Sequence, residues 1–238
     1  MAVQTSAIAA NLERVSEKVA RAAERAGRST DQVTIVAVSK TFPAETIRAA
    51  HDAGLRHFGE NRIQEFEAKQ ATQLGLADAV WHFIGHLQSN KAHRAVHLFD
   101  RIDSIDSIGL AHKVDAAAAQ ERKRQPVLIE VKLSGEETKS GVCESELRTL
   151  GETICRLPHI ELHGLLTIPP YAEDPQVARA HFRKLRELRD GLRRELGLEL
   201  PFLSMGMSHD FDVAIEEGAT EIRIGTALFG ERVGARNR

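Results

Sequence analysis

Lys40 is the residue of this sequence whose type and position most favour covalent chemistry. It follows the apolar run from Val33 to Ser39, whose β-branched residues are typical of a buried strand. An amine at the end of such a strand is partly withdrawn from water, which disfavours the ammonium and favours the nucleophilic amine. Lys40 is therefore a candidate for a Schiff base with a carbonyl compound. The alternative, an exposed lysine at the start of a loop, stays open on this stretch alone.

Two later segments place glycine beside hydroxyl residues at expected strand-to-helix turns. They are Ser204 to Ser208, S-M-G-M-S, and Ile224 to Thr226, I-G-T. Backbone N–H groups at a helix start attract anions, glycine allows close approach, and a hydroxyl adds a donor. Each segment alone is a weak signal, because serine or threonine at a helix start is usually only a cap. Together with Lys40 they favour a phosphorylated aldehyde as the ligand.

Composition limits the classes of protein to which these residues can belong. The 238 residues are 42% hydrophobic and 28% charged, with a formal net charge of -2, which indicates one soluble domain spanning 1–238. The 32 basic and 34 acidic residues are interspersed, so we expect no nucleic-acid binding. The N-terminal segment carries charges within its apolar periodicity, which excludes a secretory signal and a membrane span. Cys143 and Cys155 form neither a disulfide framework nor a metal-ligand spacing, so no metal and a cytoplasmic location are expected.

The hydrophobic pattern alternates between strand and helix along the chain. A first helix over about 5–26, ended by Gly27, is amphipathic and is expected to pack outside the elements that follow. The predicted strands are 33–39, 56–59, 81–85, 101–105, 126–131, 159–166, 202–205 and 221–224. Helices are predicted between them, and Ser89, Ser107 and Ser208 are expected at the start of three of these helices.

Eight strands alternating with helices over this length predict an α/β fold, a (β/α)8 TIM barrel with one extra N-terminal helix. A doubly wound sheet is disfavoured because no G-x-G-x-x-G turn follows the first strand. In a barrel the residues just after each strand meet at one face. That face gathers Lys40, Asn61, His86, Ser104, Lys132, Thr167, Ser204, Gly206, Ser208, Arg223, Gly225 and Thr226. Taken singly, His86 or Ser104 is more simply a capping or loop residue.

Several longer motifs resemble those of a known family. They are V-A-V-S-K at 36–40, F-G-E-N-R-I-Q-E at 58–65, W-H-F-I-G-H-L-Q-S-N-K at 81–91, E-T-K-S-G at 137–141, L-S-M-G-M-S-H-D-F at 203–211 and R-I-G-T-A-L-F-G at 223–230. In this order they resemble the pyridoxal phosphate homeostasis proteins, also called the YggS or PROSC family. The resemblance covers nearly the whole chain and extends to the barrel domain of alanine racemase.

The resemblance implies that pyridoxal 5′-phosphate forms a Schiff base with Lys40 and that Arg223 faces its pyridine nitrogen. It also implies that the phosphate lies near the S-M-G-M-S and I-G-T segments, and that Asn61 and His86 lie near the cofactor. The cofactor-binding set is then Lys40, Asn61, His86, Ser204, Met205, Gly206, Ser208, Arg223, Gly225 and Thr226. His209, Lys132 and Thr167 depart from the residues usual in the family, and none belongs to that set.

The residue type at position 223 helps to decide whether the protein is a carrier of the cofactor or an enzyme. Enzymes that use this cofactor as an electron sink usually place a carboxylate against the pyridine nitrogen to keep it protonated. A guanidinium stays a donor and cannot supply that proton, so carbanion stabilisation is weak. This favours a carrier, or a racemase that avoids a long-lived quinonoid. The alternative of Arg223 as a surface residue is disfavoured because it stands between Ile222 and Ile224 on a barrel strand.

The resemblance implies a protein without catalytic residues that binds the cofactor and maintains intracellular vitamin B6 and amino-acid balance. PLP-dependent apoenzymes are expected recipients of the cofactor, and the protein is expected to be a monomer. A racemase or lyase that depends on pyridoxal 5′-phosphate is the alternative. Against it, no second β domain is apparent, and Tyr171, the sole tyrosine, is a poor candidate for the second base. A Schiff-base aldolase that binds a sugar phosphate without a cofactor is a further alternative.

Overall fold

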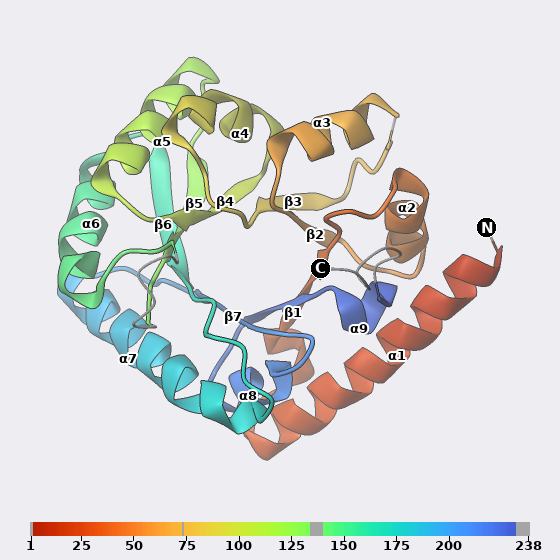
Figure 1. The fold of residues 1–238 in the computed structure, drawn as a ribbon. Coiled ribbons are helices and arrows are strands. Elements are labelled where there is room, and N and C mark those ends of the chain that lie inside the picture. Colours follow the sequence, from red (N-terminus) through yellow and green to blue (C-terminus); the bar gives the residue numbers. More distant parts are fainter. Residues whose placement is uncertain (1, 73, 134–139, 232–238) are drawn as a thin grey trace.

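Eight parallel strands close into a barrel in chain order in this computed structural model, which describes residues 2–72, 74–133 and 140–231 (Figure 1). The strands are β1 (Thr34–Val38), β2 (His57–Glu60), β3 (Val80–Phe83), β4 (Arg101–Ile105), β5 (Gln125–Glu130), β6 (Ile160–Leu166), β7 (Phe202–Met207) and β8 (Glu221–Ile224). The barrel closes where β8 pairs with β1, with Arg223 opposite Val36. The predicted (β/α)8 TIM barrel is confirmed.

Helices follow the strands and form a ring around the barrel (Figure 1). They are α1 (Ala2–Arg25), α2 (Ala44–Asp52), α3 (Ile63–Ala71), α4 (Ala92–Leu98), α5 (Ile108–Gln120), α6 (Glu144–Arg156), α7 (Arg179–Leu196), α8 (Phe211–Glu216) and α9 (Thr226–Phe229), with 3₁₀ turns at Thr30–Gln32, Ser89–Lys91 and Pro175–Ala178. The longest helix after α1, α7, buries Phe182, Leu185 and Leu192 at helical spacing. Within the described ranges, no helix is both long enough and apolar enough to cross a membrane.

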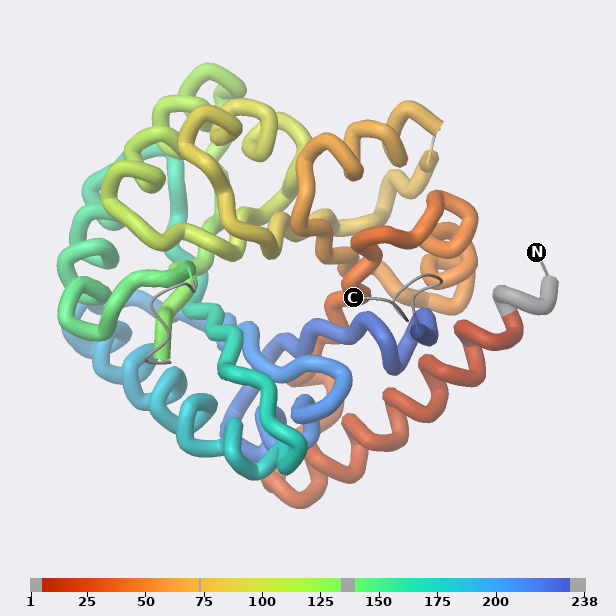
Figure 2. Tube along the Cα trace, in the orientation of Figure 1, coloured from red at the N-terminus to blue at the C-terminus, as the bar shows by residue number. Residues whose placement is uncertain are grey.

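Helix α1 packs on the outside of the helical ring, as its amphipathic pattern predicts. Its larger buried side chains, Ile8, Val15 and Val19, recur at helical spacing. The helix runs beside α8 and α9 (Figures 1 and 2). The Asn11 side-chain amide also donates a hydrogen bond to the Leu228 carbonyl, 2.7 Å away. A hydrogen bond thus joins α1 to α9, the last helix that the structure describes.

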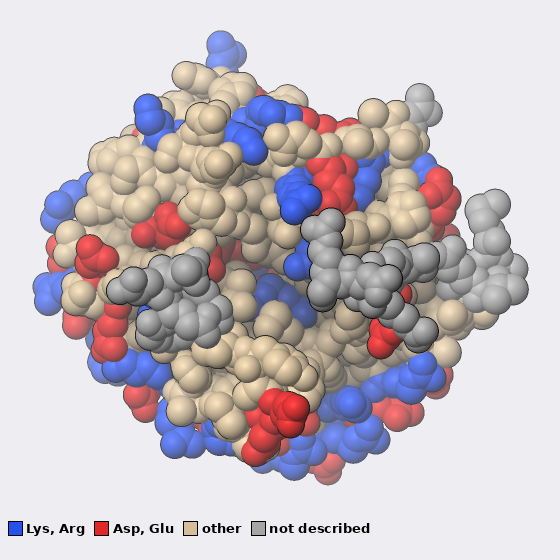
Figure 3. All heavy atoms as spheres, in the orientation of Figure 1, with Lys and Arg blue, Asp and Glu red and all other residues tan. Residues whose placement is uncertain are grey.

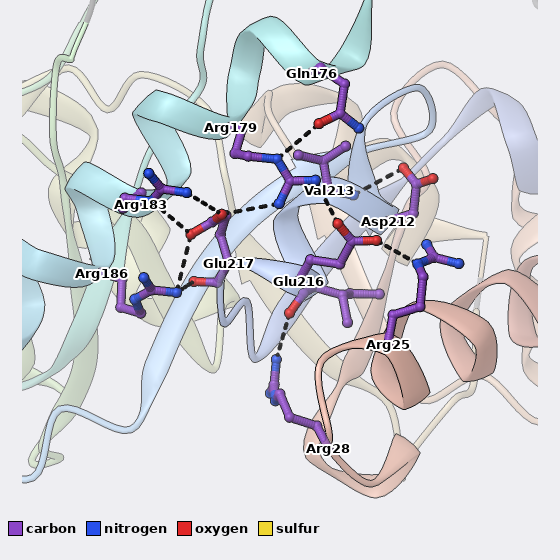
Figure 4. A network of polar contacts seen from close by, with 11 residues as sticks. Arg25, Arg28, Gln176, Arg179, Arg183, Arg186, Asp212, Val213, Glu216 and Glu217 are labelled. Atoms are coloured by element: carbon purple, nitrogen blue, oxygen red, sulfur yellow. Dashed lines mark hydrogen bonds and ion pairs between the residues drawn. The ribbon is translucent and has the colours of Figure 1, made fainter.

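Arginines of α1 and α7 meet the carboxylates at the end of α8, and Arg28 of a connecting turn donates to the Ile215 backbone carbonyl nearby (Figure 4). Glu217 is buried and forms ion pairs with Arg179, Arg183 and Arg186 of α7, at 3.0, 3.1 and 3.2 Å. Glu216 pairs with Arg25 of α1 at 2.6 Å. The cluster joins α1, α7 and α8 through side chains rather than through the sheet.

Two of the three serines expected at helix starts do not occupy that position. Ser107 caps α5 as predicted, because its side chain accepts a hydrogen bond from the Leu110 N–H. The expected cap at Ser89 is wrong, since Ser89 lies inside a 3₁₀ turn that precedes α4. The expected start of a helix at Ser208 is also wrong, and its hydroxyl has the different role described below.

Charged side chains fill part of the barrel interior. Arg101 on β4 binds both carboxylate oxygens of Asp103, two residues along the same strand, at 2.6 and 2.9 Å. It also contacts the Glu221 carboxylate on β8 at 2.6 Å. Because β4 and β8 are not neighbours in the sheet, this pair crosses the barrel. All three side chains are buried, so each charge depends on its partners for compensation.

The His57 and His82 imidazoles extend this network. His57 Nδ1 lies 3.0 Å from His82 Nε2, and His82 Nδ1 lies 3.5 Å from the Asp103 carboxylate. Burial, together with the nearby His82 and Arg101, lowers the pKa of His57 from 6.5 to about 4. Asp103 opposes this shift.

Stability is expected to fall as the pH is lowered from about 6.5 to about 4, because the unfolded chain protonates His57 in that window and the folded chain does not. After allowance for the partial exposure of His57, its contribution amounts to about 1 to 2 kcal/mol. Urea unfolding at pH 7 and at pH 4.5 measures the loss. His57→Gln should reduce it, and the exposed His97→Gln serves as control. An equal loss in wild type and His57→Gln would contradict the assignment.

Candidate functional site

A cavity of about 610 Å³ opens where the carboxyl ends of the strands meet. Such an opening is where barrels of this type place their ligands. Figure 3 shows a hollow near the centre of this face with Lys and Arg atoms inside it. Most of the predicted binding residues line the cavity: Lys40, Asn61, His86, Ser208, Arg223, Gly225 and Thr226.

Three predicted binding residues, Ser204, Met205 and Gly206, are not among the cavity-lining residues. All three are buried in β7. Ser204 lies behind the cavity wall, where its hydroxyl accepts a hydrogen bond from Arg223 Nη1 at 2.9 Å. Gly206 has φ +91°, and a Cβ there would lie 2.6 Å from the Ala214 Cβ. The close approach that this glycine permits is therefore to α8.

The Ser208 hydroxyl joins the ends of β7 and β8. Helix α8 begins only at Phe211, and the Asp210 carboxylate at its start accepts the Met207 N–H at 2.6 Å. The Ser208 hydroxyl instead accepts hydrogen bonds from the Gly225 and Ala227 N–H groups, each at 3.2 Å. Ser208, Gly225 and Thr226 all line the cavity, and the Ser208 hydroxyl links the Gly225 and Ala227 N–H groups at that place. This arrangement suits an anion with several oxygens, such as a phosphate.

Lys40 lies in the turn that follows β1, two residues beyond the last strand residue, Val38. It is half-buried and lines the cavity. The next residue, Thr41, has φ +71°, a left-handed conformation that is uncommon for any residue other than glycine. One residue further, the Phe42 ring packs on the Phe229 ring of α9, with 4.8 Å between centroids. The turn that carries Lys40 is therefore in contact with the helix that begins at Thr226.

Arg223 is a buried cation in the cavity wall, and the alternative of a surface arginine is wrong. It is 4% exposed, and its Nη2 donates to the Thr167 carbonyl at 2.8 Å. Burial lowers the pKa of its guanidinium, while the nearby carboxylates, of which Asp103 and Glu130 have the largest effects, oppose that shift. The hydrogen bonds to Ser204 and Thr167 fix the orientation of the guanidinium plane.

Glu130 is a cavity residue that the sequence reasoning missed. It is the last residue of β5, only 8% exposed, and it lines the cavity. Burial raises the pKa of its carboxyl, partly offset by Arg223. The predicted strand ends at Val131, so the pattern indicates Lys132, the next residue, as the one that reaches the cavity from this strand. The signal in the sequence is that Glu130 is a charged residue inside an otherwise apolar strand, one residue before its expected end.

Of the three positions that depart from the family pattern, Lys132 and His209 line the cavity and Thr167 contacts Arg223 from behind. The Tyr171 ring packs against His209 at 5.4 Å and is 78% exposed, at the mouth of the cavity. Ser104 is buried in β4 and does not line the cavity. The segment 134–139, which includes part of the E-T-K-S-G motif, lies outside the described residues. No group of side chains in the described part of the chain has the composition and spacing of a metal site.

Comparisons with known proteins match this chain along nearly its full length. The family described as alanine racemase, N-terminal domain, matches residues 3–233. A pyridoxal phosphate homeostasis protein of Aquifex aeolicus is 51% identical over 221 residues, covering 93% of this chain and 96% of the relative. One from Pseudomonas aeruginosa is 43% identical and covers 95% and 96% of the two chains. The structure of PipY from Synechococcus elongatus, solved with PLP bound, is 40% identical, covers 90% of this chain and 100% of that chain, and has a TM-score of 0.80.

Proposed function

Because the chain belongs to the pyridoxal phosphate homeostasis family, we propose that it binds pyridoxal 5′-phosphate (PLP) and acts in vitamin B6 and amino-acid homeostasis without catalytic turnover. One observation carries the proposal. A lysine, a buried arginine, and two hydroxyl residues next to a glycine at the start of α9 line one cavity at the carboxyl face of the barrel. These are the groups that an aldehyde, a pyridine nitrogen and a phosphate require.

The residues present fit this cofactor. Ser208, Gly225 and Thr226 would hold the phosphate with hydroxyl and backbone donors. Lys40 would supply the amine for the aldehyde, and Arg223 would face the ring nitrogen. Asn61 and His86 complete the wall of the cavity. Ser204, Met205 and Gly206 do not line the cavity. Ser204 would orient Arg223, Gly206 allows the close approach of α8 to β7, and Met205 is buried in the core.

Arg223 supports a carrier rather than an electron-sink enzyme. When bound, PLP can stabilise a carbanion, and this capacity is greatest when the pyridine nitrogen is protonated. The Arg223 guanidinium donates hydrogen bonds to Ser204 and Thr167 and has carboxylates around it that favour its charged form. A donor at this place leaves the nitrogen unprotonated.

The alternative of a PLP-dependent racemase or lyase rests on the match to the alanine racemase N-terminal domain. Racemisation through two bases needs acid–base groups on both faces of the substrate α-carbon. Tyr171 remains a poor candidate for the second base, because most of its ring is exposed and its contact is with His209. The cofactor-free aldolase is disfavoured by the likeness to a PLP-bound relative.

The test of this proposal is to load the purified protein with PLP, record its visible absorbance, reduce it with borohydride and map the labelled peptide. A yellow protein labelled on Lys40 is the expected result. Loaded protein should then release PLP to a PLP-dependent apoenzyme, while amino acids in D₂O should show no enzyme-dependent exchange of the α-proton. A colourless, unlabelled protein would refute PLP binding, and rapid α-proton exchange would favour the enzyme.

Replacing Ser208 and Thr226 with alanine is expected to weaken PLP retention, because both hydroxyls lie at the proposed phosphate end of the cavity. Each lost charge-assisted hydrogen bond is worth about 1 to 3 kcal/mol, or roughly 5- to 150-fold in affinity. Equilibrium dialysis measures the retention, and Ser145→Ala on the exposed start of α6 is the control. Unchanged retention in the double variant would place the phosphate elsewhere.

PLP-dependent apoenzymes are the recipients that we propose, and the released cofactor would reach them through the open mouth of the cavity. We also propose that the protein acts as a monomer in the cytoplasm. Its two cysteines, Cys143 and Cys155, are exposed and unpaired, which suits a reducing compartment. Sedimentation of the loaded protein tests the monomer, and a dimer mass would contradict it.

A further inference from the structure

Lys69 is a second lysine close to the turn that carries Lys40, and it is buried. It lies on α3 and is 7% exposed. Its ammonium donates to the Ser39 carbonyl at 3.0 Å and contacts the Glu60 carboxylate at 2.6 Å. It also pairs with the Glu65 carboxylate at 2.8 Å. A buried ammonium with three oxygen partners is fully engaged, so Lys69 has a structural role and is not poised to react.

The two carboxylates that hold Lys69 also hold the residues on both sides of Lys40. The Ser39 hydroxyl donates to Glu60 Oε1 at 2.7 Å, and the Glu60 side chain is fully buried at the end of β2. On the other side, the Thr41 N–H donates to Glu65 Oε1. The peptide units before and after Lys40 are therefore bound to one charged group of side chains from β2 and α3.

This arrangement also maintains a backbone conformation that the sequence does not favour. Thr41 is β-branched and has φ +71°, a strained conformation that persists only where surrounding contacts enforce it. The hydrogen bond from its N–H to Glu65 is such a contact. Without it, the turn can relax toward an ordinary conformation and carry the Lys40 side chain with it.

We propose that Glu60, Glu65 and Lys69, which we call the Lys69 clamp, are positioning residues that hold the Lys40 amine at the reactive distance from the aldehyde. The inference rests on the proposed function and adds residues that do not line the cavity. In the bond-forming step the Lys40 nitrogen attacks the aldehyde carbon, a C=N bond replaces the C=O bond, and the oxygen leaves as water with both amine protons. The rate of such a step depends steeply on the placement of the two atoms.

The test separates covalent bonding from cavity binding by using two ligands. PLP can react with Lys40, whereas pyridoxine 5′-phosphate keeps the ring and the phosphate but has an alcohol in place of the aldehyde. Lys69→Met keeps the aliphatic stem and removes the ammonium. It should form the Lys40 bond about 10- to 100-fold more slowly, as measured by stopped-flow absorbance, while its affinity for pyridoxine 5′-phosphate changes less than about twofold. Lys184→Met, which removes an exposed lysine paired with Glu144, is the matched control.

A second pair of variants tests the clamp if Lys69→Met does not fold. Glu65→Leu removes the acceptor of the Thr41 N–H, and Glu65→Gln retains an acceptor oxygen. The leucine variant should react slowly and the glutamine variant close to the wild-type rate. Borohydride mapping of Lys40→Ala should find no label on Lys69, as expected for an engaged ammonium.

Three outcomes would overturn the clamp. They are wild-type rates in both Lys69→Met and Glu65→Leu, an equal loss of PLP and pyridoxine 5′-phosphate binding, and labelling of Lys69. If the proposed function itself is wrong, the result differs from all three, because the wild-type protein would then bind neither PLP nor pyridoxine 5′-phosphate.

Discussion

Lys40→Ala is expected to bind PLP without the visible absorbance of the bound form and to yield no borohydride-trapped adduct. The variant loses the only amine that we place against the aldehyde, while Ser208, Gly225 and Thr226 remain to hold the phosphate. Retention should therefore drop by a large factor without falling to zero. Because Lys40 is half-buried in a turn, its truncation should leave the far-UV circular dichroism and the unfolding midpoint close to wild type.

Lys132→Ala is the control for this experiment, since Lys132 lines the same cavity from the end of β5. It should still give a labelled Lys40 peptide. An unchanged spectrum in Lys40→Ala would mean that the reactive amine has been misassigned. The same conclusion would follow if the wild-type protein carried the borohydride label on Lys132. Either result would leave the barrel intact and the cofactor chemistry to be reassigned.

Arg101→Met is expected to produce the largest loss of stability among the substitutions considered. The arginine compensates two buried carboxylates, Asp103 and Glu221, and methionine leaves both without their main partner. Removing one member of a buried ion pair typically costs about 3 to 5 kcal/mol. Urea unfolding at neutral pH measures the change. Arg94→Met, which breaks an exposed pair with Glu67, should cost less than about 1 kcal/mol.

A loss for Arg101→Met no larger than that for Arg94→Met would contradict this account of the barrel interior. A double variant gives a further check. Arg101→Met combined with Glu221→Leu removes one of the two stranded carboxylates and should recover part of the lost stability.

The order of elements was predictable from the sequence because local patterns decide it. The apolar run before Lys40 predicted the first strand, and the structure has β1 there. Gly225 predicted the end of the last strand, and the structure has α9 beginning at the next residue, Thr226. The role of Ser208 was not predictable in the same way. Its hydroxyl accepts hydrogen bonds from residues 17 and 19 positions later in the chain, and no local spacing signals such a contact.

The charged interior was hidden for a related reason. Arg101 and Asp103 lie on either side of Ile102, and Glu221 and Arg223 lie on either side of Ile222, a pattern that equally fits strands with one solvated face. Only closure of the barrel turns that face inward and brings Arg101 to Glu221 across 120 residues of sequence. The Lys69 clamp was missed likewise, because Glu65 and Lys69, four residues apart in a polar helical stretch, suggest an exposed surface.

The contacts of α1 also constrain the order in which the protein can assemble during synthesis. Asn11 donates to the carbonyl of Leu228, 217 positions later, and β1 completes its pairing only when β8 is present. A nascent chain on the ribosome thus has β1 without its β8 partner, and α1 without its α9 partner, until residues 221–228 have been synthesised. Such long-range closure slows folding and leaves apolar surface open to association. Val15 and Val19, which are buried in the folded protein, form part of this apolar surface until the barrel closes.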